Sequence, residues 1–174
     1  MKLVILSDTH GLLRPAVQAR LEGADAILHA GDVNTPAVVE ALRGFAPLYI
    51  VRGNNDKDWA ASLPLDLRFS LGGLAFHMVH DKRDLPADLA GVDVVVYGHS
   101  HRYAQEVRGG VLYLNPGSCG PRRFHQEITL AEMAIEDGAW IMRGLDWDDP
   151  SRIQSWEELI GWIDEVGFLP LFKN

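Results

Sequence analysis

Six short, strand-like apolar runs of the chain each lead into a polar segment that carries aspartate, asparagine or histidine, mostly beside glycine. These segments are residues 7–11, 29–32, 52–56, 80–81, 98–101 and 115–118. Open α/β sheets bind their ligands at the carboxyl ends of the strands, so six such segments are expected to converge on one site. The pattern therefore constrains the fold and the function together.

The order of the apolar runs predicts an α/β protein with two sheets. In the first half, runs at 2–6, 26–30 and 48–51 alternate with helix-like stretches at 14–21 and 36–42, as β-α-β units do. In the second half, Gly-Gly and Asp-Gly pairs indicate tight turns between strands. The hairpins expected there span 67–80, 103–114 and 127–145, and a further strand is expected at 93–97. We expect the two sheets to pack together with helices outside.

Charge and hydropathy exclude several classes of protein. Sixteen basic and 24 acidic residues give a net charge of −8, which repels nucleic-acid phosphates and anionic membranes. No uncharged apolar stretch approaches the roughly 18 residues of a membrane span, and the opening run at 3–6 is shorter than a signal-peptide core of about 7–15 residues. The single cysteine, Cys119, excludes a multi-cysteine metal cluster. We predict a cytoplasmic protein with neither a nucleic-acid polymer nor a membrane as its partner.

The segment 146–174 is expected to be a Trp-rich helical extension of a domain that spans 1–145. One apolar helical face is predicted there, formed by Trp156, Leu159, Ile160 and Ile163. We expect this helix to pack on the same domain. A dimer interface is the alternative, and it leaves a homo-oligomer open.

The residue types at the strand ends indicate a divalent metal centre. Carboxylate, imidazole and amide groups without thiolate suit Mn²⁺, Fe²⁺, Co²⁺, Ni²⁺ or Zn²⁺. Asp8 and His10 are two positions apart, as are His99 and His101, so an extended backbone would point each pair to one side. Because there are too many candidate ligands for one ion that leaves room for a substrate, we expect two ions.

The motifs, in chain order, resemble the calcineurin-like metallophosphoesterase superfamily. They are Asp8-x-His10, Gly31-Asp32, Gly53-Asn54, His80 and Gly98-His99-x-His101. The short chain, the Gly-Asn-x-Asp form at 53–56 and the Asn-Pro-Gly-Ser block at 115–118 are similar to the small YfcE-like phosphodiesterase branch. The resemblance covers residues 1–145 and implies a four-layer α-β-β-α sandwich of two mixed sheets with flanking helices.

This resemblance implies a role for each matched residue. One metal ion would be held by Asp8, His10, Asp32 and His101. The other would be held by Asp32, Asn54, His80 and His99, with Asp32 bridging the two ions and Asp32 and Asn54 counted as catalytic. A bridging hydroxide would attack a phosphate ester in line. The implied activity is that of a dinuclear metal-dependent phosphodiesterase acting on a small phosphate ester, with Mn²⁺ expected and Ni²⁺, Co²⁺, Fe²⁺ or Zn²⁺ as alternatives.

Two residues depart from the family pattern. Larger members carry a histidine after the motif asparagine, where it can protonate the leaving oxygen, and this chain has Asn55. An amide donates a hydrogen bond but gives up no proton, and general acid catalysis contributes about 10²–10⁴-fold, so we expect slow turnover of poor leaving groups. Asp81 stands where many relatives have glycine. It could crowd the site, orient a neighbouring ligand or point to solvent.

The alternative function is a non-catalytic scaffold that binds a protein partner. The retromer subunit of vacuolar sorting resembles the same small branch and acts mainly as a binding module. The complete set of matched ligands favours the enzyme, whereas Asn55 in place of the family's histidine argues against an enzyme with fast turnover.

Other polar residues near the strand ends leave two interpretations open. Asp56 could brace the loop of Asn54 or lie at the surface, and His29 could support the metal ligands or be structural. His125 could replace the missing proton donor, and the arginines at 122–123 could hold a phosphate, although solvated side chains are the simpler expectation. His77 should point to the opposite face of its strand from His80.

Overall fold

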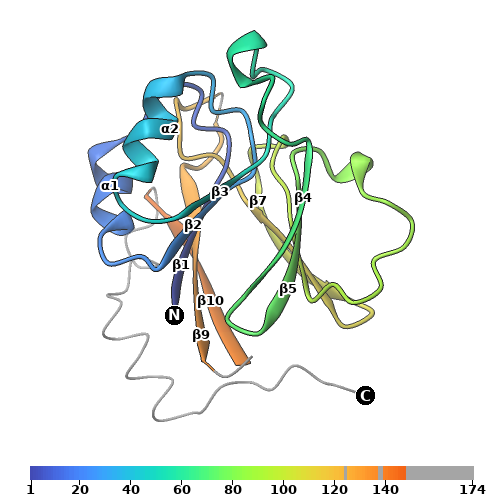
Figure 1. Ribbon diagram of the computed structural model, residues 1–174. Coiled ribbons are helices and arrows are strands. Elements are labelled where there is room, and N and C mark those ends of the chain that lie inside the picture. The colour runs from blue at the N-terminus through green and yellow to red at the C-terminus, as the bar shows by residue number, and fades with distance from the viewer. Residues whose placement is uncertain (124, 137–138, 148–174) are drawn as a thin grey trace.

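A computed structural model describes residues 1–123, 125–136 and 139–147, which form two five-stranded mixed sheets that face each other (Figure 1). In sheet A the strand order is β10-β9-β1-β2-β3, and in sheet B it is β4-β5-β6-β8-β7. Sheet A consists of β1 (Lys2–Leu6), β2 (Ala26–His29), β3 (Leu48–Ile50), β9 (Thr129–Glu136) and β10 (Ala139–Asp146). Sheet B consists of β4 (Asp66–Leu71), β5 (Leu74–Val79), β6 (Val94–Val96), β7 (Tyr103–Arg108) and β8 (Val111–Pro116). The predicted α/β sandwich of two mixed sheets is confirmed.

Two α-helices flank sheet A. Helices α1 (Pro15–Leu21) and α2 (Pro36–Arg43) both begin with proline, whose missing N–H has no role in the first turn. Two 3₁₀ turns follow strands, η1 (Asp58–Ala60) after β3 and η2 (Lys82–Asp84) after β5. The Lys82 ammonium of η2 lies 5.1 Å from the centre of the Tyr113 ring on β8. Since the neighbours of Tyr113 in the strand, Leu112 and Leu114, face the core between the sheets, η2 lies on the outer face of sheet B.

The side chains of β1 alternate between two hydrophobic layers. Leu3 and Ile5 face sheet B and pack in the core between the sheets, whereas Val4 and Leu6 pack with the helices on the outer side. All four side chains have no exposed surface. A strand buried on both faces has no polar positions, which explains the continuous apolar run in the sequence.

The last hairpin returns to the first sheet. Strand β9 pairs antiparallel with β1, with Lys2 opposite Ala134 and Ile5 opposite Ala131. Strand β1 is therefore the central strand of sheet A, with its parallel partner β2 on the other side. Apolar periodicity predicts the hairpin itself but contains no information on which sheet it joins.

The carboxyl ends of the parallel strands in the two sheets come close together. Gly98, after β6 of sheet B, lies against Ser7, after β1 of sheet A. A Cβ atom at Gly98 would overlap the Ser7 hydroxyl and would also crowd the Asp8 carboxylate. The glycine is thus required because the Ser7 and Asp8 side chains lie directly against its backbone, which brings the polar loops of both sheets into one cluster.

At its C-terminal side, the described chain ends one residue after β10. Trp147 packs against the outer hydrophobic layer, and its backbone N–H donates to the Ile128 carbonyl at 3.1 Å. The predicted helix of the 146–174 extension lies outside the described residues. Among the described helices, none combines the length and apolar character needed to cross a membrane.

Candidate metal centre

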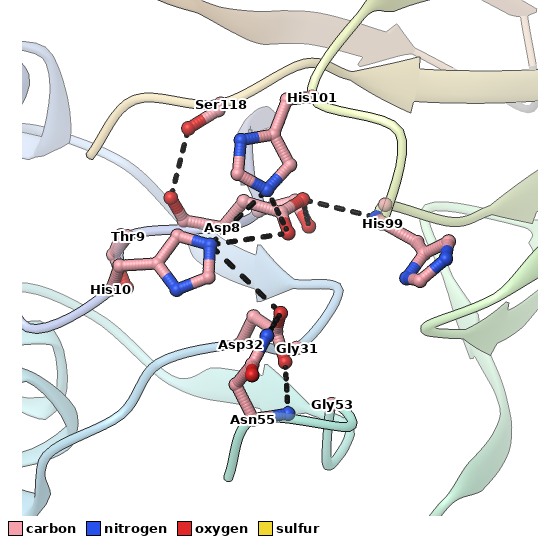
Figure 2. Close-up of polar contacts among 12 residues, drawn as sticks. Asp8, Thr9, His10, Gly31, Asp32, Gly53, Asn55, His99, His101 and Ser118 are labelled. Carbon is pink, nitrogen blue, oxygen red and sulfur yellow. Dashed lines mark hydrogen bonds and ion pairs between the residues drawn. The ribbon is translucent and has the colours of Figure 1, made fainter. Parts of the chain in front are cut away.

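Each of the seven predicted metal ligands lies in a loop that follows a strand. Figure 2 shows five of them close together: Asp8, His10, Asp32, His99 and His101. Of the seven ligands, four come from sheet A: Asp8 and His10 follow β1, Asp32 follows β2 and Asn54 follows β3. Three come from sheet B: His80 follows β5, and His99 and His101 follow β6.

The backbone of these loops is left-handed at most of the predicted ligands. The φ angles are +54° at Asp8, +45° at His10, +57° at Asp32, +69° at His99 and +57° at His101. Among the described residues, the one further non-glycine residue with positive φ is Asn34, at +70°. The extended backbone expected at the two motif pairs is therefore wrong, although Asp8 and His10 still point to one cluster. Left-handed residues other than glycine cost roughly 1 kcal/mol or more each, and such strain concentrates at functional sites.

Asp8, His10 and His101 form a first, buried cluster. Asp8 Oδ1 lies 3.2 Å from His101 Nε2 and 3.8 Å from His10 Nε2, and these two ring nitrogens are 3.1 Å apart. Figure 2 shows both rings directed at the Asp8 carboxylate. Asp8 Oδ1 is buried and has no hydrogen-bond partner. An unpartnered buried carboxylate oxygen is strongly unfavourable, so the cluster fits a cation at this point.

Asn54, His80 and His99 form a second, more open cluster. Asn54 Oδ1 lies 3.1 Å from His80 Nε2 and 3.1 Å from His99 Nδ1. The other ring nitrogen of His80 lies 2.7 Å from the Ala30 carbonyl, which can only accept a hydrogen bond. The Nδ1–H of His80 therefore donates to Ala30, and Nε2 is the nitrogen that would bind a cation once it has lost its proton.

Asp32 lies between the two clusters. Its Oδ2 is 3.9 Å from His10 Nε2 of the first cluster and 3.5 Å from His80 Nε2 of the second. The carboxylate is nearly fully buried. An oxygen within reach of both groups is the arrangement that a bridging ligand requires.

Asp32 and His80 shift each other's pKa values in opposite directions. Burial disfavours the charged form of both groups, but the contact between them reverses this. The contact with His80 and the hydrogen bonds from Asn55 hold the pKa of Asp32 well below its usual range. The contact with Asp32 raises the pKa of His80 to about 9. A protonated His80 thus balances the charge of Asp32, and a divalent ion that binds here would displace the proton from Nε2 and take over this role.

Asn55, predicted to stand at the position of the missing proton donor, contacts Asp32. Its Nδ2 donates to Asp32 Oδ2 at 2.6 Å, and its backbone N–H donates to Asp32 Oδ1 at 2.8 Å. The amide therefore anchors the central carboxylate. It holds no proton that it could transfer to a leaving group.

Asp56 is the buried brace of the site. Its Oδ2 accepts the backbone N–H groups of Asp32 at 3.0 Å and Gly53 at 2.8 Å, and its Oδ1 accepts that of Asn34 at 2.6 Å. The residue is 1% exposed. Of the two interpretations left open by the sequence, the structure therefore supports bracing, and it extends the brace to the loop of Asp32.

Replacing Asp56 by alanine is expected to lower the free energy of unfolding by roughly 3–5 kcal/mol, because three backbone N–H groups would lose their charged acceptor. Urea unfolding followed by circular dichroism measures this loss. Asp88→Ala is the matched control, since Asp88 accepts one backbone N–H, from Ala90, at the exposed surface. We expect about 1 kcal/mol or less for the control. Equal losses in the two variants would contradict the bracing role.

Asn34 is a site residue that the sequence analysis missed. Its side-chain nitrogen lies 3.2 Å from His10 Nδ1, and its Oδ1 is buried without a partner. A half-turn of the amide would let Oδ1 accept the Nδ1–H of His10 and would leave His10 Nε2 free to bind a cation. The signal available in the sequence was weak: asparagine tolerates left-handed backbone and follows the Gly31-Asp32 motif by two residues.

His29 links two loops of the site. Its Nδ1 accepts the backbone N–H of Gly31 at 3.2 Å, so Nε2 carries the proton that is shared with Thr9 Oγ1 at 3.0 Å. Burial lowers the pKa of His29 to about 4, so the ring is neutral at pH 7. Of its two proposed roles, the geometry favours support of the metal loops.

The remaining residues considered from the sequence are peripheral. His77 is buried on the face of β5 opposite the site and bonds to Asp66. Burial raises the pKa of the Cys119 thiol to about 12, which leaves it unsuited to be a nucleophile. His125 lines a pocket together with His101. Burial and the nearby positive charge of Arg123 together lower the pKa of His10.

Two mixed sheets with a cluster of carboxylate, imidazole and amide groups at their loop ends define an α/β sandwich with a candidate metal centre. A model of the calcineurin-like phosphoesterase superfamily domain matches residues 1–138. The chain therefore belongs to this superfamily, whose members bind divalent metals and act on small phosphate esters. The predicted family is confirmed.

The relatives of this chain include named phosphoesterases. The chain is 30% identical over 159 residues to the probable metallophosphoesterase YsnB of Bacillus subtilis, covering 84% of this chain and 91% of YsnB. It is 32% identical over 149 residues to the phosphodiesterase YfcE of Escherichia coli, covering 68% of this chain and 79% of YfcE. These relatives agree with the family model in placing the chain among the phosphoesterases.

Solved structures support the fold. The structure of YfcE matches with a TM-score of 0.62 at 27% identity, over 77% of this chain and 88% of that chain. The structure of Vps29 complexed with zinc from Entamoeba histolytica matches with a TM-score of 0.71, over 86% of this chain and 94% of that chain. At 20% identity, the likeness to Vps29 shows a shared fold alone.

Proposed function

We propose that the chain is a metal-dependent phosphodiesterase that holds two divalent ions at the loop ends and hydrolyses a small phosphate diester. The observation that carries the proposal is the position of Asp32 between two clusters of ligand atoms, one of which includes the unpartnered, buried Asp8 Oδ1. All seven ligands implied by the family resemblance belong to these clusters or to Asp32. The resemblance to the family makes Mn²⁺ the expected occupant, and this nitrogen and oxygen donor set also suits Ni²⁺, Co²⁺, Fe²⁺ or Zn²⁺.

The chain's residues would hold the ions and keep their geometry. Two bound divalent ions would lower the pKa of a water molecule and neutralise charge on the phosphoryl group. Asp8 and Asp32 provide the negative charge, and the histidines provide neutral nitrogen donors. Asn55 and Asp56 fix the Asp32 loop from two sides, through its side chain and its backbone.

Two pockets beside the clusters support a diester rather than a monoester. One, of about 550 Å³, is lined by His101 of the first cluster together with Tyr103 and His125. The other, of about 530 Å³, is lined by Asn54 and His99 of the second cluster together with other residues. A phosphodiester carries an organic group on each of two ester oxygens, and a pocket beside each cluster offers space for both.

The test is hydrolysis of bis-p-nitrophenyl phosphate by chelator-stripped protein, with Mn²⁺, Ni²⁺, Co²⁺, Zn²⁺ or Mg²⁺ added back. We expect turnover to return with metal, to be fastest with Mn²⁺, and to exceed turnover of the monoester p-nitrophenyl phosphate. The Asp32→Ala variant, prepared identically, controls for a contaminating phosphatase. If the wild-type protein binds metal but hydrolyses neither ester with any ion, the enzyme proposal fails and a protein-binding scaffold becomes the better account.

A further inference from the structure

Asp81 lies directly after His80 in the chain and beside His99 in space. Asp81 Oδ2 is 3.5 Å from His99 Nε2. The other nitrogen of the same ring, Nδ1, is 3.1 Å from Asn54 Oδ1 in the second cluster. The imidazole of His99 therefore lies between a carboxylate on one side and the proposed metal position on the other.

Arg83 fixes the direction of the Asp81 carboxylate. The Arg83 guanidinium donates to both carboxylate oxygens, from Nε at 3.1 and 3.0 Å and from Nη2 at 2.5 Å, and the Arg83 backbone N–H donates to Oδ1 at 2.9 Å. These four hydrogen bonds come from turn η2. They hold the carboxylate in place while Oδ2 faces His99.

A partner of this kind matters most for His99 among the histidine ligands. Its side chain is 42% exposed, so packing alone does not fix the ring. The rings of His10 and His80 are 3% and 5% exposed, and the second nitrogen of His80 is held by the Ala30 carbonyl. A carboxylate accepts hydrogen bonds but cannot donate them, so it selects the form of His99 that carries its proton on Nε2.

We propose that Asp81 is a positioning residue that accepts the Nε2–H of His99 and so directs the Nδ1 lone pair at the second metal. In this form, His99 Nδ1, Asn54 Oδ1 and His80 Nε2 present three lone pairs to one point. The inference rests on the proposed function, since it assumes that a metal occupies the second cluster. Carboxylate–histidine–metal arrangements orient the ring and raise its basicity, and loss of the carboxylate weakens metal binding by about 10–100-fold.

The test is calorimetric titration of the full-length, chelator-stripped chain with Mn²⁺. We expect two sites in the wild-type protein and, in Asp81→Ala, a second site that is weakened by about 10–100-fold, while the first changes by less than about threefold. Asp81→Asn keeps an acceptor oxygen without the charge, so it should retain most of the affinity. Glu40→Ala, which removes an exposed carboxylate from an arginine pair on α2, should leave both sites unchanged.

In Asp81→Ala, the unpaired Arg83 guanidinium could itself repel the metal ion. The double variant Asp81→Ala/Arg83→Ala removes this repulsion, and we expect it to bind Mn²⁺ at the second site as weakly as Asp81→Ala does. A direct readout is the ¹⁵N chemical shift of the His99 ring in Zn²⁺-loaded wild-type protein, where the proton is expected on Nε2. The inference is overturned if the proton is on Nδ1, if Asp81→Ala binds like wild type, or if Asp81→Asn binds as weakly as Asp81→Ala. Failure of the wild-type chain to bind any metal would instead refute the proposed function.

Discussion

Replacing Asp32 by asparagine is expected to reduce the metal-dependent hydrolysis of bis-p-nitrophenyl phosphate by at least about a thousandfold, equivalent to roughly 4 kcal/mol of transition-state stabilisation. Asp32 lies between both clusters, so neutralising it removes charge from two metal positions at once. Asparagine is the informative choice because its side chain has nearly the same shape. It also tolerates the left-handed backbone at this position, where φ is +57°.

Steady-state kinetics on metal-saturated protein measures this loss, and Mn²⁺ titration shows whether both sites are weakened. Glu40→Gln is the matched control, because it neutralises a carboxylate whose side chain is 70% exposed on α2. That variant should keep the wild-type rate. If Asp32→Asn loses less than about tenfold, Asp32 is not shared between two metals and the dinuclear assignment fails.

Replacing Asn55 by histidine is expected to raise the rate on a phosphodiester with an alkyl leaving group by about tenfold or more, because an imidazolium can protonate the departing oxygen. On bis-p-nitrophenyl phosphate the change should stay below about threefold, since p-nitrophenolate leaves without a proton. The new acid must be protonated to act. The rate of the Asn55→His variant on the alkyl ester should therefore fall as pH rises through the pKa of the introduced imidazole. The pH–rate profile of the wild-type protein should not show this fall.

The control for this substitution is Asn55→Ala. Asn55 donates two hydrogen bonds to Asp32, and the one from the side chain is lost in either variant unless the imidazole replaces it. A gain in the histidine variant together with a loss in the alanine variant assigns the gain to the imidazole. Equal rates of wild type and Asn55→His on the alkyl ester would show that Asn55 does not limit turnover.

The strands and the ends of the strands were predictable from the sequence because local pattern determines them. Strand β1 matches its predicted bounds at 2–6. A strand that is buried on both faces is a continuous apolar run, so the polar residue that follows the run marks where the strand ends. The polar residues after β1, β2, β3, β5 and β6 come together because parallel strands place their carboxyl ends at the same edge.

The details that orient the ligands were not predictable, because they depend on contacts between loops. The left-handed backbone at Asp8 and His10 is held by hydrogen bonds from their N–H groups to the carbonyls of Gly31 and Asp32. Asp56 binds three N–H groups from two loops that are separate in the sequence. Such contacts have no periodic signature, so two-residue spacing led to the wrong backbone geometry.

The central position of β1 has a consequence for how the protein folds. Lys2 pairs with Ala134, so sheet A is completed only when segments near opposite ends of the described chain meet. Bringing such distant segments together loses chain entropy before the contacts form, and proteins with many pairings of this kind fold slowly. The loop that carries Asp8 and His10 lies at the end of this same strand. The first cluster also needs His101 of sheet B beside Asp8, so it should form only when the two sheets have come together.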